Sequence, residues 1–347
     1  MNLPEIAPPD ETARRRAQRR WDSIAKPLGS LGLLETALCD IAALTGSAAV
    51  ELRPRSVIVF CADNGVTAQG VTQTDSGVTG VVARELARGR TAVCRMAQAA
   101  DCRVIPVDMG IRDFLGFPGV LDRRIGNGTA DFTQGPAMSR ENAERAILAG
   151  VDLVKRERER GTRLLAIGEM GIGNTTTASA ITSVLLGRDP EEVTGRGAGL
   201  SSDGLRRKTE AIRAGIALNR PDPFDALDAL SKLGGYDLAG MCGAYLGGAL
   251  YGVPTLMDGF PSAVAALCAV RLRPASAKAI FASHVSAEPA GNLVLQALGK
   301  RPLLTAEMRL GEGTGAVCAM PALDMALAVY RDAYTFTDGG IPAYTPQ

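Results

Sequence analysis

The sequence predicts an α/β protein with a mostly parallel sheet flanked by helices. Short apolar runs of strand length alternate with longer helical patterns along 347 residues, which is typical of crossover units on a parallel sheet. Glycine is frequent, with 40 residues, and the excess follows the apolar runs, which indicates many turns that could face a ligand. Ligands bind at the carboxyl edge of such sheets, so we expect function there.

Five segments have the composition of buried strands. The run Val57–Cys61 is apolar and rich in β-branched residues, and Leu164–Ile167 has a similar character. Pro106 has no N–H for a ladder hydrogen bond, so we expect it at a sheet edge or a bulge. The five expected strands are 57–61, 103–107, 164–167, 254–257 and 279–283.

Helical patterns occupy much of the remaining chain. One feature stands out at the predicted helix 204–218, because Lys208 lies near its start, where a cation opposes the helix dipole. Either a bound anion holds this lysine there or it is an ordinary surface lysine. The other helices are expected at 11–44 with a break at 26–32, 78–88, 91–100, 139–160, 178 onward, 224–233, 238–251 and 316–333.

Composition narrows the possible functions. The 38 basic and 37 acidic residues nearly balance, which argues against a nucleic-acid or membrane-surface partner. No apolar run approaches the ~20 residues that span a bilayer, and the acidic, proline-rich N-terminal segment is not a signal peptide. Seven dispersed cysteines without a C-x-x-C pair indicate a reduced, cytoplasmic protein with no metal site. His284 is the one histidine, which excludes H-E-x-x-H zinc chemistry.

A polar residue follows each predicted strand. Bringing six such side chains to one edge is costly unless they serve a ligand or one another. The aspartates among them can be structural, since aspartate often accepts N–H bonds in turns. Glu169 and Glu312 point more strongly to function, because glutamate is a poor turn residue and each lies beside glycine. The six are Asp63, Asp108, Glu169, Asp258, His284 and Glu312, the last after a sixth apolar segment, Met308–Leu310.

The stretch Leu164–Ser179 (LLAIGEMGIGNTTTAS) predicts a strand, a glycine-rich turn and a helix. Such a turn presents backbone N–H groups to an anion, and the threonine hydroxyls add donors. Gly171 and Gly173 permit a backbone path that a side chain would obstruct. With no metal cluster, histidine dyad or evident nucleophile in the sequence, this anion cradle and its glutamates indicate group transfer by positioning and a general base.

These motifs resemble those of the nicotinate-nucleotide:dimethylbenzimidazole phosphoribosyltransferase family. The resemblance implies a Rossmann-like sheet with a small helical domain from both chain ends (1–50 plus 316–347), a large α/β domain (51–315), no cofactor and a homodimer. It rests on Lys26–Gly32 (KPLGSLG), Gly168–Thr176 (GEMGIGNTT), Gly195–Gly197 with Gly199 and Leu200, Asp258–Phe260, Ser283–His284 and Arg309–Ala316 (RLGEGTGA).

Members of that family move phosphoribose from nicotinate mononucleotide to an aromatic base, 5,6-dimethylbenzimidazole, in cobalamin lower-ligand assembly. The resemblance implies that Glu312 is the catalytic base and that Glu169 lies at the active site. It also implies substrate contacts by Gly171, Gly173, Asn174, Thr175, Thr176, Lys208, Ser286, Gly313, Asp258 and a base-binding loop at Thr72 and Gln73.

One departure from the family pattern leaves the acceptor open. Many members have Asp-His-Gly where this chain has Asp63-Asn64-Gly65, close to the expected acceptor loop. A phenolic or purine acceptor therefore stays open, as does a non-catalytic nucleotide sensor. A nucleotide-dependent kinase is a further alternative, although Asn174-Thr175 stands where a Walker lysine would be needed.

Overall fold

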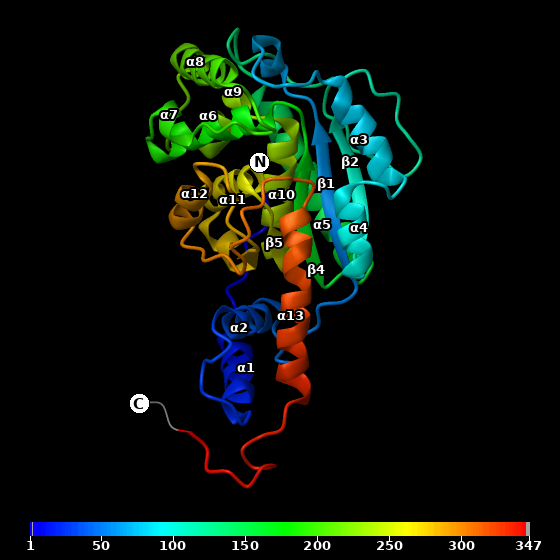
Figure 1. Ribbon diagram of the computed structural model, residues 1–347, viewed down its shortest axis with the longest axis vertical. Helices are drawn as coiled ribbons and strands as arrows, with labels where there is room; N and C mark the ends of the chain where they lie inside the picture. Colours follow the sequence, from blue (N-terminus) through cyan, green and yellow to red (C-terminus); the bar gives the residue numbers. More distant parts are fainter. Residues whose placement is uncertain (2, 345–347) are drawn as a thin grey trace.

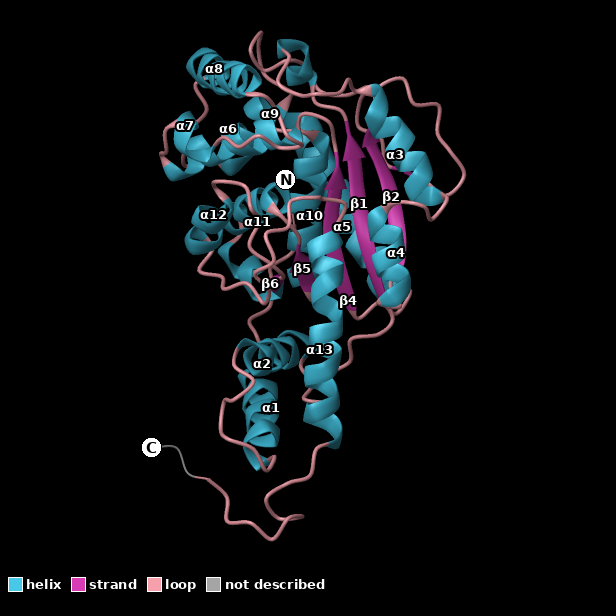
Figure 2. Cartoon of the chain, in the orientation of Figure 1, coloured by secondary structure: helices cyan, strands magenta, loops and turns pink. Residues whose placement is uncertain are grey.

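The computed structural model describes residue 1 and residues 3–344. At its centre is a six-stranded parallel sheet in the order β3-β2-β1-β4-β5-β6 (Figure 2). This order is that of the Rossmann fold, so the predicted fold class is confirmed. The strands are β1 (Arg55–Ala62), β2 (Arg103–Gly110), β3 (Leu121–Asp122), β4 (Leu164–Met170), β5 (Thr255–Met257) and β6 (Ile280–Ala282).

Helices cover both faces of this sheet (Figure 1). The longer ones are α1 (Glu11–Ser23), α2 (Leu33–Thr45), α3 (Gly77–Ala87), α5 (Arg140–Glu159), α6 (Asn174–Leu186), α8 (Ser202–Asn219), α10 (Tyr236–Tyr251), α11 (Phe260–Leu272) and α13 (Thr314–Asp332). The shorter ones are α4 (Ala92–Ala99), α7 (Pro190–Val193), α9 (Ala226–Leu233) and α12 (Gly291–Ala297), with 3-10 turns η1 (Gly65–Gln69) and η2 (Pro274–Ala279).

The alternation of side chains along β1 builds two hydrophobic cores. Ile58 and Phe60 lie in the core that contains α5, α10 and α11. Val57 and Val59 point to the other face and pack with α4 and α13. The small residues of α10 bring it close to α5, since a Cβ on Gly243 would fall 1.9 Å from a backbone oxygen of α5. The packing thereby leaves the carboxyl edge of the sheet free for loops.

The two chain ends meet beyond the opposite edge of the sheet. Figure 1 shows α1 and α2 beside the last turns of α13. Arg20 donates to the backbone oxygens of Tyr330 and Ala333, at 2.8 and 3.0 Å, and Trp21 packs on the Tyr330 ring. The domain boundaries at 50/51 and 315/316 stay a prediction, because α13 packs on both parts. Residues 2 and 345–347 of the predicted small domain lie outside the described residues.

Three features of the sheet and its connections differ in how well the sequence predicted them. Pro106 lies in β2, which stands between β3 and β1 and is not an edge strand, but β3 pairs only with Val107 and Asp108 among the described residues, so Pro106 has a strand partner on its β1 side alone. The segment Met308–Leu310 is not a strand, and the sixth strand is β3 instead. The helix α11 was not expected, because it is buried on nearly all sides and lacks an amphipathic pattern.

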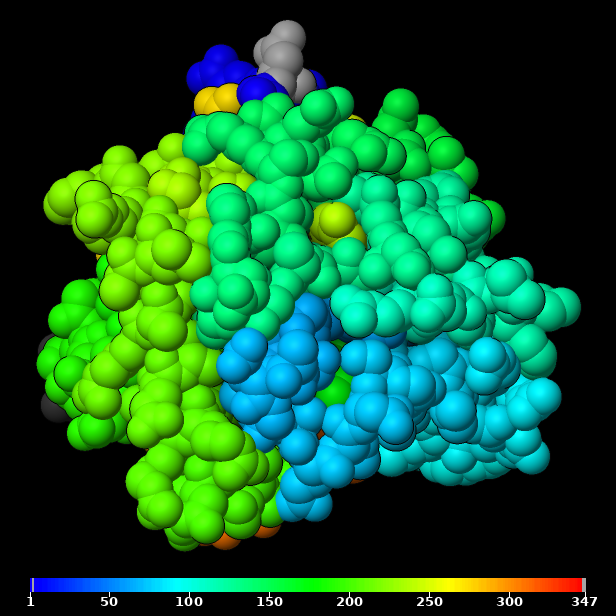
Figure 3. Space-filling view, turned by 90° about the horizontal axis from the view of Figure 1, so that it is seen from above, coloured from blue at the N-terminus to red at the C-terminus, as the bar shows by residue number. Residues whose placement is uncertain are grey.

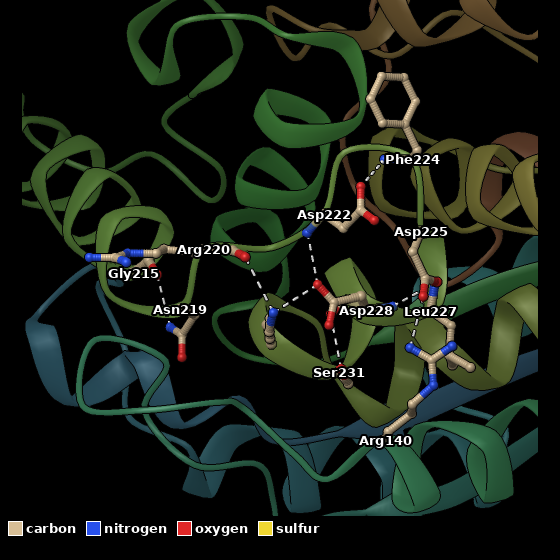
Figure 4. A network of polar contacts seen from close by, with 11 residues as sticks. Arg140, Gly215, Asn219, Arg220, Asp222, Phe224, Asp225, Leu227, Asp228 and Ser231 are labelled. Carbon is tan, nitrogen blue, oxygen red and sulfur yellow. Dashed lines mark hydrogen bonds and ion pairs between the residues drawn. The ribbon is translucent and has the colours of Figure 1, made fainter.

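A polar network fixes the corner between α8 and α9 (Figure 4). Asp225 caps α9 and pairs with Arg140 of α5 at 2.8 Å. Lys232 donates to Asp228 at 2.9 Å and to the backbone oxygen of Arg220, after the end of α8, at 3.3 Å. Helix α8, which carries Lys208, is therefore tied to the helices around it.

Candidate active site

A cavity of about 350 Å³ lies at the carboxyl edge of the sheet, and this volume lies within the range of small-molecule sites. Seen from above, residues 65–76 lie beside α8 over this edge, and Arg207 donates to the Gly70 backbone oxygen there (Figure 3). The predicted site residues in the cavity wall are Thr72, Gln73, Glu169, Gly171, Gly173, Asn174, Thr175, Lys208 and Ser286. Thr176, Asp258, Glu312 and Gly313 are not among the residues that form the wall.

The part of the cavity wall around Lys208, called the lysine end below, can hold an anion. Helix α6 begins after Gly173, whose φ of +94° favours glycine, and no side chain caps its first turn. Lys208 is only 1% exposed and donates to Thr175 Oγ1 and to the Gly195 backbone oxygen, both at 2.9 Å. Burial lowers the pKa of Lys208 to about 8, and nearby Glu288 opposes that shift. The surface-lysine interpretation is therefore wrong, and a bound anion would stabilise this ammonium.

The part of the cavity wall around Glu169, called the glutamate end below, is acidic. Glu169 ends β4, is 9% exposed and accepts a short hydrogen bond from the Asn174 side chain. The pKa of Glu169 is raised to about 8, mainly by burial and also by the Asp237, Asp258 and Glu312 carboxylates, and the Asn174 hydrogen bond opposes the shift. A carboxyl group with such a pKa can hold or release a proton near neutrality.

Glu312 lies directly beside Glu169. Its backbone N–H donates to the Glu169 backbone oxygen at 3.0 Å, and its φ is +60°, in the left-handed region. Its carboxylate accepts from the Val93 N–H, at the start of α4, at 3.3 Å. Gly311, the residue before it, lines the cavity. The two predicted catalytic glutamates are thus brought together from β4 and from the turn before α13.

Asp258 holds the turn that carries Glu312. It is 2% exposed and accepts from the backbone N–H groups of Gly313, Gly315 and Ala316 at 3.0, 2.7 and 3.2 Å. Burial raises the pKa of Asp258, and the neighbouring His284 opposes the shift. The prediction that Asp258 and Gly313 contact substrate does not fit this arrangement, since their polar groups bind each other.

The remaining strand-end aspartates are structural in the way that turn aspartates usually are. Asp63 accepts from Thr79 Oγ1 at 2.7 Å and from the Arg112 N–H at 2.8 Å. Asp108 accepts from the Gly110 N–H at 2.9 Å. Thr176 is also fully buried, behind the cavity wall. These residues shape the loops of the edge without lining the cavity.

Several lining residues were missing from the predicted set. Arg196 and Arg309 add positive charge to the wall, and Phe260 and Glu288 are also part of it, together with His284, which was expected at this edge but not as a substrate contact. All but Glu288 lie inside or next to the motifs already recognised, so motif proximity is the signal that finds most of them. Asp237, behind Glu169, had no such signal, because an aspartate in the first turn of an apolar helix is an ordinary sequence context.

A Rossmann sheet with a nucleotide-sized cavity, lined by a buried lysine and by Glu169 with Glu312 beside it, defines a group-transfer enzyme for an anionic substrate. A family model described as a phosphoribosyltransferase matches residues 6–341. Within residues 1 and 3–344, no helix is long and apolar enough to cross a membrane. The same residues contain no group of three or more His, Cys, Asp or Glu side chains placed to hold a metal ion.

Known proteins resemble this chain over nearly its whole length. The nicotinate-nucleotide–dimethylbenzimidazole phosphoribosyltransferase of Acetivibrio thermocellus is 45% identical over 330 residues, covering 95% of this chain and 94% of that protein. The enzyme of the same name from Escherichia coli K12 is 42% identical, covering 93% and 90%. The crystal structure of CobT from Thermus thermophilus has a TM-score of 0.90 at 42% identity, covering 96% and 100%. The chain belongs to the nicotinate-nucleotide–dimethylbenzimidazole phosphoribosyltransferase family.

Proposed function

We propose that this protein transfers phosphoribose from nicotinate mononucleotide to 5,6-dimethylbenzimidazole, giving α-ribazole 5′-phosphate and nicotinate, in cobalamin biosynthesis. The observation that carries this proposal is one cavity lined by the buried Lys208 ammonium and by Glu169, with Glu312 bonded to Glu169 directly beside the wall. The names of the homologous enzymes support the same substrates. The expected compartment is the cytoplasm.

The chemistry needs a phosphate site and a proton acceptor on the same cavity. Lys208, Thr175 and the first N–H groups of α6 bind the 5′-phosphate of the donor. The acceptor nitrogen attacks C1′ of the ribose from the face opposite nicotinate. The new C–N bond forms as the bond to nicotinate breaks, nicotinate leaves with that electron pair, and the attack yields the α-nucleotide.

Glu312 is the general base in this proposal. The acceptor carries a proton on its second ring nitrogen, and the Glu312 carboxylate takes that proton as the glycosidic bond forms. The Val93 N–H holds the Glu312 carboxylate, and Asp258 holds the turn behind it. Glu169 contributes the adjacent wall, where its buried carboxyl group faces the donor.

Asn64 gives little reason to prefer another acceptor. It is fully buried and is not among the residues that form the cavity wall, so no acceptor would contact it directly. Any preference for a phenolic or purine acceptor would therefore have to come from residues other than Asn64. The Thr72–Gln73 loop is a better place to look, because Gln73 lines the cavity and donates to the Gly199 backbone oxygen across its mouth.

Product analysis tests the proposal. The enzyme is incubated with nicotinate mononucleotide and with 5,6-dimethylbenzimidazole, a phenol or adenine, and both nicotinate and the product nucleotide are measured. We expect stoichiometric nicotinate and α-ribazole 5′-phosphate with dimethylbenzimidazole, and much less product with the others. Donor binding without nicotinate release would instead favour a nucleotide sensor.

The oligomeric state needs a separate test. We propose a homodimer, as the family resemblance implies. Light scattering coupled to gel filtration should give twice the mass of one chain. A mass equal to one chain at micromolar concentration would refute the homodimer and leave the transfer reaction untouched.

A further inference from the structure

Asp237 is a buried carboxyl group for which the proposed mechanism has no use. It lies in the first turn of α10, is fully buried and does not line the cavity. Asn174 connects it to the active site, since Asn174 Nδ2 donates to Glu169 and, at 3.2 Å, to Asp237 Oδ2. An amide nitrogen has two hydrogens, so these two bonds use both.

The backbone around Asp237 leaves room for its carboxyl group and nothing else. A Cβ on Gly171 would fall 2.3 Å from Asp237 Oδ2, and one on Gly235 would fall 2.3 Å from Asp237 Oδ1. The same point on Gly235 lies 2.2 Å from Asn64 Oδ1, an atom with no hydrogen-bond partner among the described residues. The Leu238 N–H holds Asp237 Oδ1 at 2.9 Å. Two glycines and the donors from Asn174 and Leu238 therefore hold the carboxyl group in place.

We propose that Asp237 is a positioning residue of the active site, which fixes the Glu169 carboxyl group through the bridging amide of Asn174. With Asp237 in place, the Asn174 amide has one orientation that satisfies both hydrogens. Without it, the amide can rotate and Glu169 loses its only side-chain partner among the described residues. This inference rests on the proposed function, in which Glu169 forms the wall that faces the donor.

The charges of Asp237 and Glu169 couple the two residues in a second way, which can be measured. No lysine, arginine or histidine in the described part of the chain forms an ion pair with Glu169 or Asp237. Burial raises the pKa of Asp237 to about 6 and that of Glu169 to about 8, and the charge of Asp237 contributes to the second shift. Near neutrality the pair therefore carries an ionised Asp237 and a protonated Glu169. Asp258 and Glu312 also raise the pKa of Glu169, and Glu169 and Asp237 contribute to the raised pKa of the buried Cys61 thiol.

The first test follows thermal unfolding against pH without any substrate. Because the folded pKa of Glu169 is raised, the folded state binds more protons than the unfolded state between about pH 4.5 and 8, so stability falls across that range. Asp237→Asn removes the negative charge beside Glu169, which should lower the pKa of Glu169. The pH at which the loss of stability ends should therefore be lower in this variant. Asp63→Asn is the control, since it alters a buried strand-end carboxylate with no bond to Asn174, and should leave that pH unchanged.

The second test separates positioning from folding. In steady-state kinetics, Asp237→Asn should lower kcat about tenfold while KM for nicotinate mononucleotide changes less than about threefold, since misplaced catalytic groups slow the chemical step. Asn174→Ala should lower kcat at least as much, and the double variant should be no slower than Asn174→Ala alone. If Asp237→Asn does not fold, Asn174→Ala must still show this kcat loss.

Two results would overturn the inference. One is a wild-type unfolding profile and wild-type kcat in Asp237→Asn, and the other is fully additive losses in the double variant. Failure of the proposed function is distinct from both, because a wild-type protein that releases no nicotinate still gives the unfolding profiles that decide the coupling.

Discussion

Burial disfavours opposite charges at the lysine end and at the glutamate end of the cavity. At the lysine end the Lys208 ammonium donates to two neutral oxygens, and burial lowers its pKa to about 8 although Glu288 opposes that shift. At the other end Glu169 and Asp237 share one neutral amide donor, and burial raises the pKa of Glu169 to about 8. Among the described residues neither Lys208 nor Glu169 forms an ion pair, so a substrate can supply the missing partner. The lysine end requires an anion and the glutamate end exchanges a proton, which matches a phosphate donor and an N–H acceptor.

Removing the base should have the largest effect. Glu312→Gln keeps the size and the hydrogen-bonding oxygen of the side chain but cannot take the acceptor's proton. We expect turnover to fall by roughly 10²-fold or more, the usual scale for a lost general base, with nicotinate mononucleotide binding unchanged. Single-turnover kinetics with calorimetric binding checks this. Near wild-type turnover would remove Glu312 from its role.

Removing the Lys208 ammonium should weaken binding of the donor. Lys208→Met fills the same buried space without a charge, and a lost charged hydrogen bond costs roughly 1.5–3 kcal/mol, or about 10- to 150-fold in donor affinity. The control is Lys300→Met, because Lys300 is a partly buried lysine outside the cavity wall whose pKa burial also lowers. We expect donor affinity to fall only in the first variant. Equal affinity in both would place the phosphate elsewhere.

Crowding the glutamate end should lower stability. Gly171→Ala would place a Cβ 2.3 Å from Asp237 Oδ2 and 2.6 Å from the Ala62 backbone oxygen, so we expect a loss of about 1–3 kcal/mol in the free energy of unfolding. Gly135→Ala is the matched control, since a Cβ there meets no atom within 4 Å. Denaturant unfolding of the pair should show a loss in Gly171→Ala alone; equal stability would mean that Asp237 has room to move.

The smallest expected effect is on pH dependence. The free enzyme binds the donor phosphate best when Lys208 is an ammonium, so kcat/KM for nicotinate mononucleotide should fall above about pH 8, the pKa of this lysine. The fall between pH 8 and 9 should be roughly fivefold for a single group. Because Glu169 titrates in the same range, the comparison is with Lys208→Met, whose profile should lack the lysine component. Identical profiles would show that Lys208 does not control donor capture.

The lysine end was easier to predict from sequence than the glutamate end. Lys208 stood out because a cation near a helix start is locally unfavourable, and its burial gives the reason. Glu169 and Glu312 stood out as glutamates beside glycines, and the structure joins them through one backbone hydrogen bond. Asp237 gave no local signal, because its partner Asn174 is 63 positions away and only the packing of α10 against the sheet brings them together.

The same difference, between a local sequence signal and packing that only the fold creates, decided which strands and helices could be predicted. The strands β1 and β4 were visible as apolar runs because a parallel sheet buries both of their faces. The helix α11 was not visible, since uniform burial removes the periodicity that marks a helix. Asp258 was expected at a substrate and instead caps the Glu312 turn, because a buried aspartate at a strand end can satisfy several backbone N–H groups at once.

A structure of the enzyme with bound nicotinate mononucleotide tests the central claim most directly. We expect the phosphate to accept hydrogen bonds, at about 2.7–3.2 Å, from Lys208 Nζ and from the first N–H groups of α6, with C1′ of the ribose towards Glu169 and the adjacent Glu312. A phosphate bound away from Lys208, or a ribose turned from those glutamates, would contradict the account.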